Sequence, residues 1–157
     1  MTGQKTLILE MTPLEAAHLS DVVGQFAELL TASAPTTDPA VARLVPDAYA
    51  DDPEGAAEFR RLTQSSLLER RGEDAARVLS SLAPLRSADP TAIEPVELPL
   101  PPDTAAAWMR CLAALRLVLA ERLGIRGEDD GDPDDPRFGV YEWLGYRLDG
   151  LVQALDT

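Results

Sequence analysis

The chain has 157 residues, a formal net charge of −13 and 45% hydrophobic residues, which is the size and composition of one ordinary globular domain. Aromatic residues make up only 5%, so Leu, Ala and Val must build the core, and such a core suits helices. A negative charge of this size opposes non-specific attraction to nucleic acid. The same charge is compatible with a partner that has a basic surface.

No apolar run reaches the roughly 18 residues needed to cross a bilayer, and the N-terminal sequence lacks a basic region followed by a long apolar stretch. One cysteine cannot form an internal disulfide or an all-cysteine metal site, in keeping with a reducing compartment. Lys5 is the only lysine among 14 basic residues, a composition typical of GC-rich bacterial genomes. We therefore expect a cytoplasmic protein with no membrane-spanning segment.

The N-terminal third predicts a short strand and a helix. Residues 7–9 are a β-type apolar run, and Thr12 followed by Pro13 is typical of a helix start, with a capping hydroxyl and a proline at the first helical position. From Leu14 to Leu30, apolar residues recur at spacings of three and four, which predicts one buried stripe.

A second helical region is expected after Asp52, where a capping carboxylate again precedes a proline. This region should carry Phe59 and Leu62 toward the core and run to Arg71. Gly72 interrupts the pattern. The sequence is compatible there with two helices that meet, which would resemble a DNA-binding helix-turn-helix, or with one kinked helix.

The C-terminal half predicts a second strand at 96–100, which can pair with 7–9 as an antiparallel ribbon, or else merely precedes a helix start. The longest apolar helix follows and ends at Gly124; a helix apolar on most sides should lie at the centre of the fold. The tract 127–136 holds six acids, two glycines and two prolines, which predicts a disordered acidic loop. A last helix should begin near Phe138.

The expected fold is therefore mostly α: a single domain over 1–157, built as a bundle of about five helices with a small two-stranded antiparallel ribbon. We expect no cofactor and no metal site. The acidic tract lacks the glycine and the closing glutamate that a calcium-binding loop places at its sixth and twelfth positions.

Three carboxylates before the second helical region could perform the acid/base chemistry of a hydrolase. Ion pairing is the more economical interpretation, because Arg116 falls between Leu112 and Leu119 on an almost wholly apolar helix. A guanidinium in that place must be paired or reach the surface. The candidate ion-pair or partner surface comprises Asp47, Asp51, Asp52, Arg60, Arg61 and Arg116.

Cys111 is a weak redox candidate. It follows Trp108 by three residues and precedes Leu115 by four, so it should be a packing position, and a thiol in apolar surroundings stays protonated and inert. His18 lies beside the first helical stripe and is likewise expected to pack. A catalytic dyad of these two residues is therefore not favoured.

Four segments carry a family resemblance: LVPDAYADDPEGAAEFRRLT, LLERRGEDAARVL, WMRCLAALRLVLAERLGI and YEWLGYRLDGLVQAL. They resemble an actinobacterial family of uncharacterised proteins, encoded beside the Clp protease adaptor, that includes an oxidative-stress transcription regulator. The resemblance implies action with an alternative sigma factor and thiol sensing through two cysteines one helical turn apart. Ala107 and Leu115 stand four residues from Cys111, so thiol sensing within one chain is not expected.

These observations predict a non-enzymatic regulatory or adaptor protein that acts by protein–protein binding in transcription or stress-response control. The expected partner is a sigma factor, another part of the transcription machinery or a proteolysis component, and the chain is also compatible with a homo-oligomer. Direct DNA regulation is one alternative, although acids at the start of the second helix of such a motif argue against DNA binding by the chain alone. Hydrolysis by the Asp cluster is the other alternative.

Overall fold

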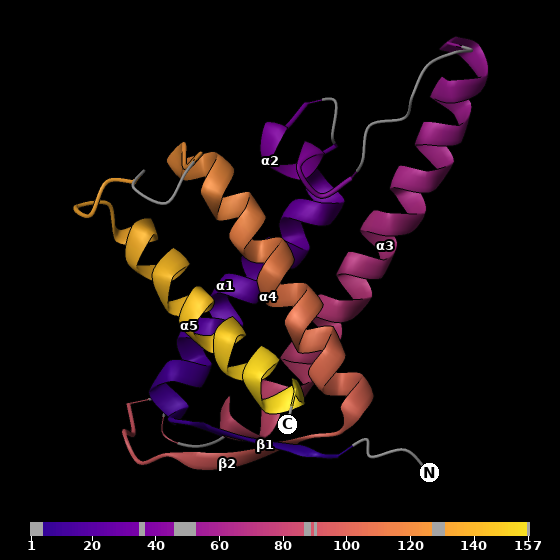
Figure 1. The fold of residues 1–157 in the computed structure, drawn as a ribbon. Coiled ribbons are helices and arrows are strands. Elements are labelled where there is room, and N and C mark those ends of the chain that lie inside the picture. The colour runs from indigo at the N-terminus through magenta and orange to yellow at the C-terminus, as the bar shows by residue number, and fades with distance from the viewer. Residues whose placement is uncertain are drawn as a thin grey trace.

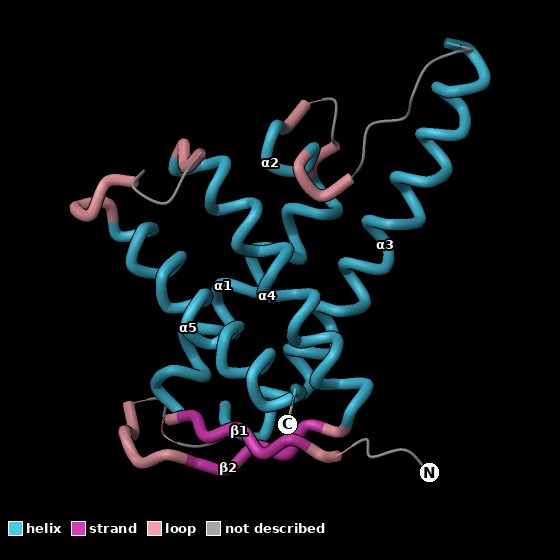
Figure 2. Tube along the Cα trace, viewed as in Figure 1, coloured by secondary structure: helices cyan, strands magenta, loops and turns pink. Residues whose placement is uncertain are grey.

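The computed structural model describes residues 5–34, 37–45, 53–86, 89, 91–126 and 131–156, with the backbone alone described at 53–57, 59, 60 and 86. The described part is mostly helical with a small two-stranded sheet, as predicted (Figure 2). No helix in these ranges is long and apolar enough to span a membrane. The elements are β1 (Leu7–Met11), α1 (Pro13–Ala32), α2 (Pro39–Ala42), α3 (Pro53–Arg86), β2 (Val96–Leu100), α4 (Pro102–Leu123) and α5 (Pro136–Asp156).

The predicted ribbon is confirmed. β1 and β2 pair antiparallel, with Leu7 opposite Leu100 and Met11 opposite Val96. Met11, Leu98 and Leu100 are buried, and the ribbon runs across the lower ends of the helices (Figure 1). Packing against helices supplies the stability that two strands alone lack.

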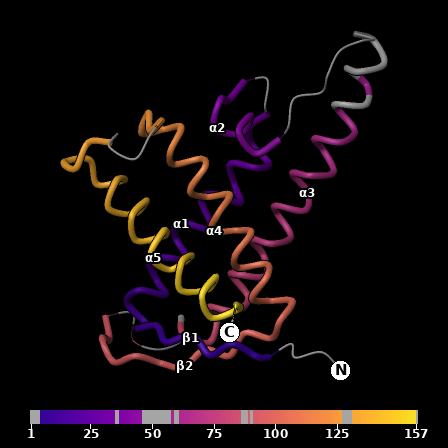
Figure 3. Tube along the Cα trace, viewed as in Figure 1, coloured from indigo at the N-terminus to yellow at the C-terminus, as the bar shows by residue number. Residues whose placement is uncertain are grey.

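Four long helices form the body of the protein. α1 packs against α3, α3 against α4, and α4 against α5, an order that can be followed along the trace in Figure 3. Side chains link α1 to α5, because the Glu15 carboxylate accepts hydrogen bonds from Trp143 and Arg147. α4 also contacts α2 and β2, which confirms its predicted central position.

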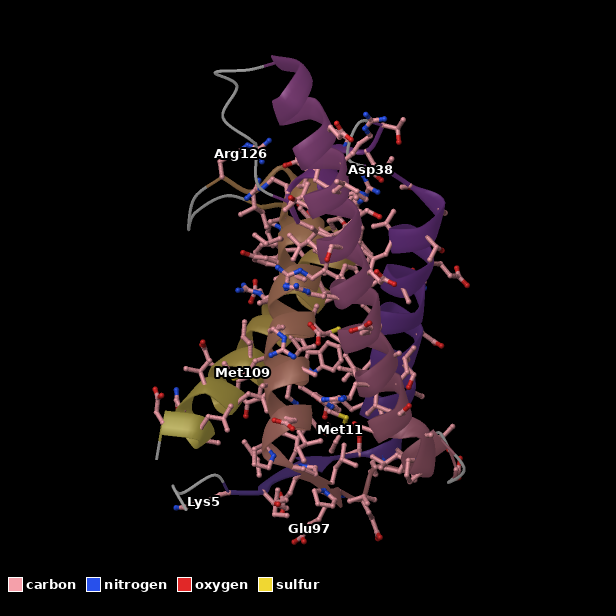
Figure 4. All side chains as sticks on the ribbon, turned by 90° about the vertical axis from the view of Figure 1, so that its right-hand side faces the viewer. Lys5, Met11, Asp38, Glu97, Met109 and Arg126 are labelled. Atoms are coloured by element: carbon pink, nitrogen blue, oxygen red, sulfur yellow. The ribbon has the colours of Figure 1, made fainter. Side chains whose placement is uncertain are left out.

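The core draws side chains from each long helix and from the ribbon. Trp108 of α4 is the largest fully buried side chain, with 1% of its surface exposed. Met11, labelled near the lower end of the molecule in Figure 4, brings the ribbon into the same core. Other members of this cluster are Leu19, Val23 and Phe26 of α1, Val78 and Leu82 of α3, Leu112 of α4, and Leu144 and Leu151 of α5.

Each of the five described helices begins with a proline, whose missing N–H costs nothing in the first helical turn. At α1 and α2 the side chain next to the proline caps the start of the helix. Thr12 Oγ1 accepts the Glu15 N–H at 3.0 Å, and Asp38 Oδ1 accepts the Ala40 N–H at 2.9 Å. At its other end α4 stops at Gly124, whose φ of 70° is the left-handed conformation that glycine tolerates best.

The structure decides between the two alternatives at Gly72 in favour of one helix. α3 is a single helix from Pro53 to Arg86, so neither two helices nor a helix-turn-helix forms there. A glycine inside a helix costs about 1 kcal/mol, which is small beside the packing of the following turns of α3 against α1 and α4. The count of five helices is reached with α2, which the sequence did not predict.

Leu62 was expected in the core, but 68% of its surface is exposed; the side chain of Phe59 lies outside the described residues. α5 begins at Pro136, two residues before the expected start near Phe138. Of the predicted acidic loop, residues 127–130 are not described. In the part that is described, Asp135 Oδ1 accepts the Arg137 N–H at 2.9 Å, so this acid caps the start of α5.

Candidate functional site

Of the six residues proposed from the sequence as an ion-pair or partner surface, only Arg61 and Arg116 have described side chains. Asp47, Asp51 and Asp52 lie outside the described residues, so their pairing with arginines stays a prediction. Arg60 is described only as backbone of α3, and the Arg61 side chain is exposed on the same helix. Arg116 lies on α4 and faces α5.

The first turns of α3 stand apart from the body. The start of this helix rises beyond the ends of the other helices in two perpendicular views (Figures 1 and 4). No described side chain of α3 before Asp74 is fully buried. We call residues 53–66 the α3 arm. Glu58, Arg61, Leu62 and Ser65 line a shallow hollow on it.

Cys111 is buried in the core, as predicted, with 1% of its surface exposed. Burial raises the pKa of its thiol to about 12, and the negative charge of Asp74 contributes to the rise. The reactive form of cysteine is the thiolate, so this environment makes the thiol unreactive. His18, expected to pack, is instead exposed on α1.

An ion pair between the buried Asp74 and the exposed Arg110 joins α3 to α4 beside this thiol. Asp74 is 9% exposed and accepts hydrogen bonds from Arg110 Nε at 3.1 Å and Nη2 at 3.0 Å. The pair fixes the two helices relative to each other, since a bidentate contact constrains both position and orientation. No sequence pattern indicated this pair beyond the presence of the two charges.

α4 and α5 border an open cleft of about 540 Å³. Its cationic side chains are Arg43, Arg116 and Arg126, and Leu117, Ile125 and Leu148 supply apolar wall. Three of the 14 basic residues of a strongly acidic chain therefore gather around one cavity. We call this cavity the arginine cleft.

Two of the cleft arginines share one carboxylate. Arg43 Nη1 and Arg126 Nη1 each lie 3.2 Å from Glu121 Oε2, and these contacts, that with Arg126 most strongly, lower the pKa of Glu121. Nearby, Arg122 donates two hydrogen bonds of 2.7 Å to Asp38 and lowers the pKa of that carboxyl. This pair ties the end of α4 to the start of α2, at the upper end of the molecule where Asp38 and Arg126 are labelled in Figure 4.

Arg116 is held differently. Its Nε donates to the Tyr141 carbonyl oxygen at 3.1 Å, and its guanidinium carbon lies 4.0 Å from the centre of the Tyr141 ring. The sequence analysis required this charge to be paired or to reach the surface, and its contacts in the described structure are a carbonyl group and an aromatic ring of α5. Nothing in the sequence indicated a partner 25 residues away on another helix.

No group of three or more potential metal ligands occurs among the residues that the structure describes. No curated protein and no solved structure matches the chain. Residues 1–155 match a family described as a domain of unknown function, DUF2017. Because this match covers nearly the whole chain, the protein belongs to the DUF2017 family.

Proposed function

We propose that this chain is a non-enzymatic adaptor or regulator that acts by binding another protein, and that the α3 arm is part of its contact surface. The observation that carries the proposal is the exposure of Leu62, 68% of whose surface is accessible, on a helix that extends past the body of the protein (Figure 1). At 1.5 Å per residue the 34 residues of α3 span about 51 Å, against about 33 Å for the 22 residues of α4.

A helical segment without tertiary contacts is only marginally stable in water, because most helical stability in proteins comes from packing. The α3 arm is continuous with a packed half of the same helix, which holds it in place for a partner. Covering Leu62 in an interface would contribute about 1.5–3 kcal/mol. Glu58 and Arg61 beside it supply charges of both signs for the polar rim that surrounds such contacts.

The chemistry of the described residues favours binding over catalysis. The only thiol is buried with a strongly raised pKa, and the single histidine is exposed on α1, so a nucleophile and a base are not combined there. We further propose a cytoplasmic partner from the transcription or proteolysis machinery, such as a sigma factor. This choice depends on the family resemblance and on the charge of −13, which favours a partner with a basic surface.

The test compares the wild-type chain with Leu62→Gln and with the matched control Ile93→Gln. Ile93 is also apolar and exposed, at 74% of its surface, but lies in the segment before β2. Proteins retained from native cytosol are identified by mass spectrometry, and affinity is then measured with the purified partner. We expect Leu62→Gln to weaken binding by about 10- to 100-fold and Ile93→Gln to leave it unchanged.

If Leu62→Gln binds the partner as tightly as Ile93→Gln and the wild-type chain do, the α3 arm is not the contact surface. Direct DNA regulation is tested in parallel with promoter and random duplexes at roughly 0.15 M salt, where the Debye length is about 8 Å. Submicromolar, promoter-selective binding by the isolated chain would overturn the protein-binding proposal, because the arginines would then have to overcome the net charge of −13.

A further inference from the structure

We propose that the arginine cleft between α4 and α5 binds a monocarboxylate with an apolar body, and that Arg116 is the residue that recognises the carboxylate. This inference is independent of the α3 arm, because the two surfaces share no residue. It depends on how Arg116 is held, on its lack of a carboxylate partner among the described side chains, and on the apolar wall beside it.

The guanidinium of Arg116 is fixed in place before any ligand binds. Its Nε donates to the Tyr141 carbonyl oxygen, and the ring of Tyr141 covers one face at 4.0 Å. Gly145 lies on the same helix, one turn further along, and a Cβ atom there would be 2.9 Å from the guanidinium carbon. Glycine thus allows α5 to approach the guanidinium closely.

Arg116 differs from the other cationic groups of the cleft in having no counter-ion among the described residues. Six other arginines each lie within 3.2 Å of a carboxylate oxygen, Arg43 and Arg126 among them. The Nε of Arg116 is occupied by a neutral carbonyl group. Within the part of the chain that the structure describes, no carboxylate compensates the charge of this half-buried guanidinium, and a bound anion would offset the cost of removing that charge from water.

The geometry selects the class of anion. Two terminal amino groups form a planar fork that matches the two oxygens of a carboxylate. Arg116 is one guanidinium without a counter-ion in the described ranges, and it belongs to a chain of net charge −13, which favours a ligand with a single negative charge over a nucleotide with several. Leu117, Ile125 and Leu148 line the same cavity, and its size is in the range of small-molecule sites. An apolar body attached to the carboxylate would cover these side chains.

Two sources offer this chemistry: a free carboxylic acid, and the C-terminal residue of another polypeptide. The probes are octanoate and an acetylated tripeptide that ends in leucine with a free carboxylate. Octanamide and the tripeptide amide keep the apolar body without the charge, while inorganic phosphate keeps a charge without the body. Binding to the intact ¹⁵N-labelled chain is followed by the shifts of backbone amide signals on α4 and α5.

We expect saturable binding of octanoate, with octanamide and phosphate at least about tenfold weaker, since a charge-assisted hydrogen bond accounts for roughly that factor. A higher affinity of the tripeptide acid than of octanoate would assign the site to a polypeptide C-terminus, and the reverse order to a free acid. The proposal would be overturned if octanamide or phosphate bound as tightly as octanoate. It would also be overturned if neither acid bound at about 10 mM.

The assignment to Arg116 is tested with Arg116→Gln and the matched control Arg77→Gln, which removes the same charge from an exposed position on α3. Arg116→Gln should weaken octanoate binding by at least about tenfold, and Arg77→Gln should not change it. Gly145→Ala keeps the charge but displaces the guanidinium, so it should also weaken binding. Unchanged affinity in both Arg116→Gln and Gly145→Ala would refute the role of Arg116. If Arg116→Gln fails to fold, the wild-type comparison of octanoate with octanamide still decides the proposal.

Discussion

Replacing Glu15 with alanine should destabilise the protein by detaching α5 from α1. The sequence Thr12-Pro13-Leu14-Glu15 has the spacing of a capping box, in which the glutamate would return to the N-terminal backbone of its own helix. The structure keeps half of that motif, since Thr12 Oγ1 accepts the Glu15 N–H. The carboxylate instead accepts hydrogen bonds from Trp143 Nε1 at 2.7 Å and from Arg147 Nε at 2.6 Å, with a further bond from Arg147 Nη2.

The magnitude follows from burial and from the number of hydrogen bonds. Hydrogen bonds to a charged group contribute about 1.5–3 kcal/mol each, and removing one member of a buried pair costs about 3–5 kcal/mol. The side chains of Glu15 and Arg147 keep 20% and 19% of their surface exposed, so solvent weakens the pair. We therefore expect Glu15→Ala to lower the free energy of unfolding by about 2–3 kcal/mol.

The assay is urea denaturation followed by circular dichroism, with Glu28→Ala as the control, because Glu28 is an exposed glutamate on the same helix. The control should change the free energy of unfolding by less than about 0.5 kcal/mol. In a double-mutant cycle, Glu15→Ala and Arg147→Ala should be non-additive by at least about 1 kcal/mol. A loss below about 0.5 kcal/mol in Glu15→Ala, or additive effects in the cycle, would refute the link between α1 and α5.

Three further predictions concern the core, a turn and the thiol. Trp108→Ala should cost about 3–5 kcal/mol in thermal or urea unfolding, and unchanged stability would remove Trp108 from the core. Gly131→Ala should cost about 1–3 kcal/mol, because φ is 117° and the added Cβ would lie 2.4 Å from the Phe138 ring; Gly124→Ala, with open space around it, should cost less. Cys111 should resist iodoacetamide at pH 8 in the folded protein and react on unfolding. Burial raises the pKa of the Cys111 thiol to about 12 in the folded protein, whereas the thiol of the unfolded chain has a pKa of about 8.5. The stability that the neutral thiol contributes is therefore fully present below about pH 8.5 and is lost as the pH rises from there to about 12. Cys111→Ala should flatten this alkaline decline, and an equal decline in the variant would contradict the assignment.

Local sequence signals were sufficient wherever the physical cause lies within a few residues of its effect. Thr12 and Pro13 mark the start of α1 because a capping hydroxyl and a missing N–H act within the first helical turn. Gly124 marks the end of α4 for a similar reason, since its left-handed backbone is a local property. The ribbon followed from two short β-type runs, and the apolar character of α4 correctly indicated its central position.

Signals of that kind failed where contacts between distant segments decide the outcome. Gly72 weakens a helix locally, yet α3 continues through it because its later turns pack against α1 and α4. Leu62 has the spacing of a core residue but is exposed. The first turns of α3 extend beyond the ends of the other helices (Figure 1), so the lengths of the neighbouring helices, and not the local periodicity, decide burial there.

The candidate site was the least predictable part. The sequence identified Arg116 as a charge that needs a contact, but Tyr141 and Gly145 meet it only because α5 packs against α4. The pairing of Glu15 with Arg147 joins residues 132 positions apart, where no spacing rule applies. Charged side chains have several acceptable partners in a sequence, and only the tertiary packing of the helices brings one of them within hydrogen-bonding distance.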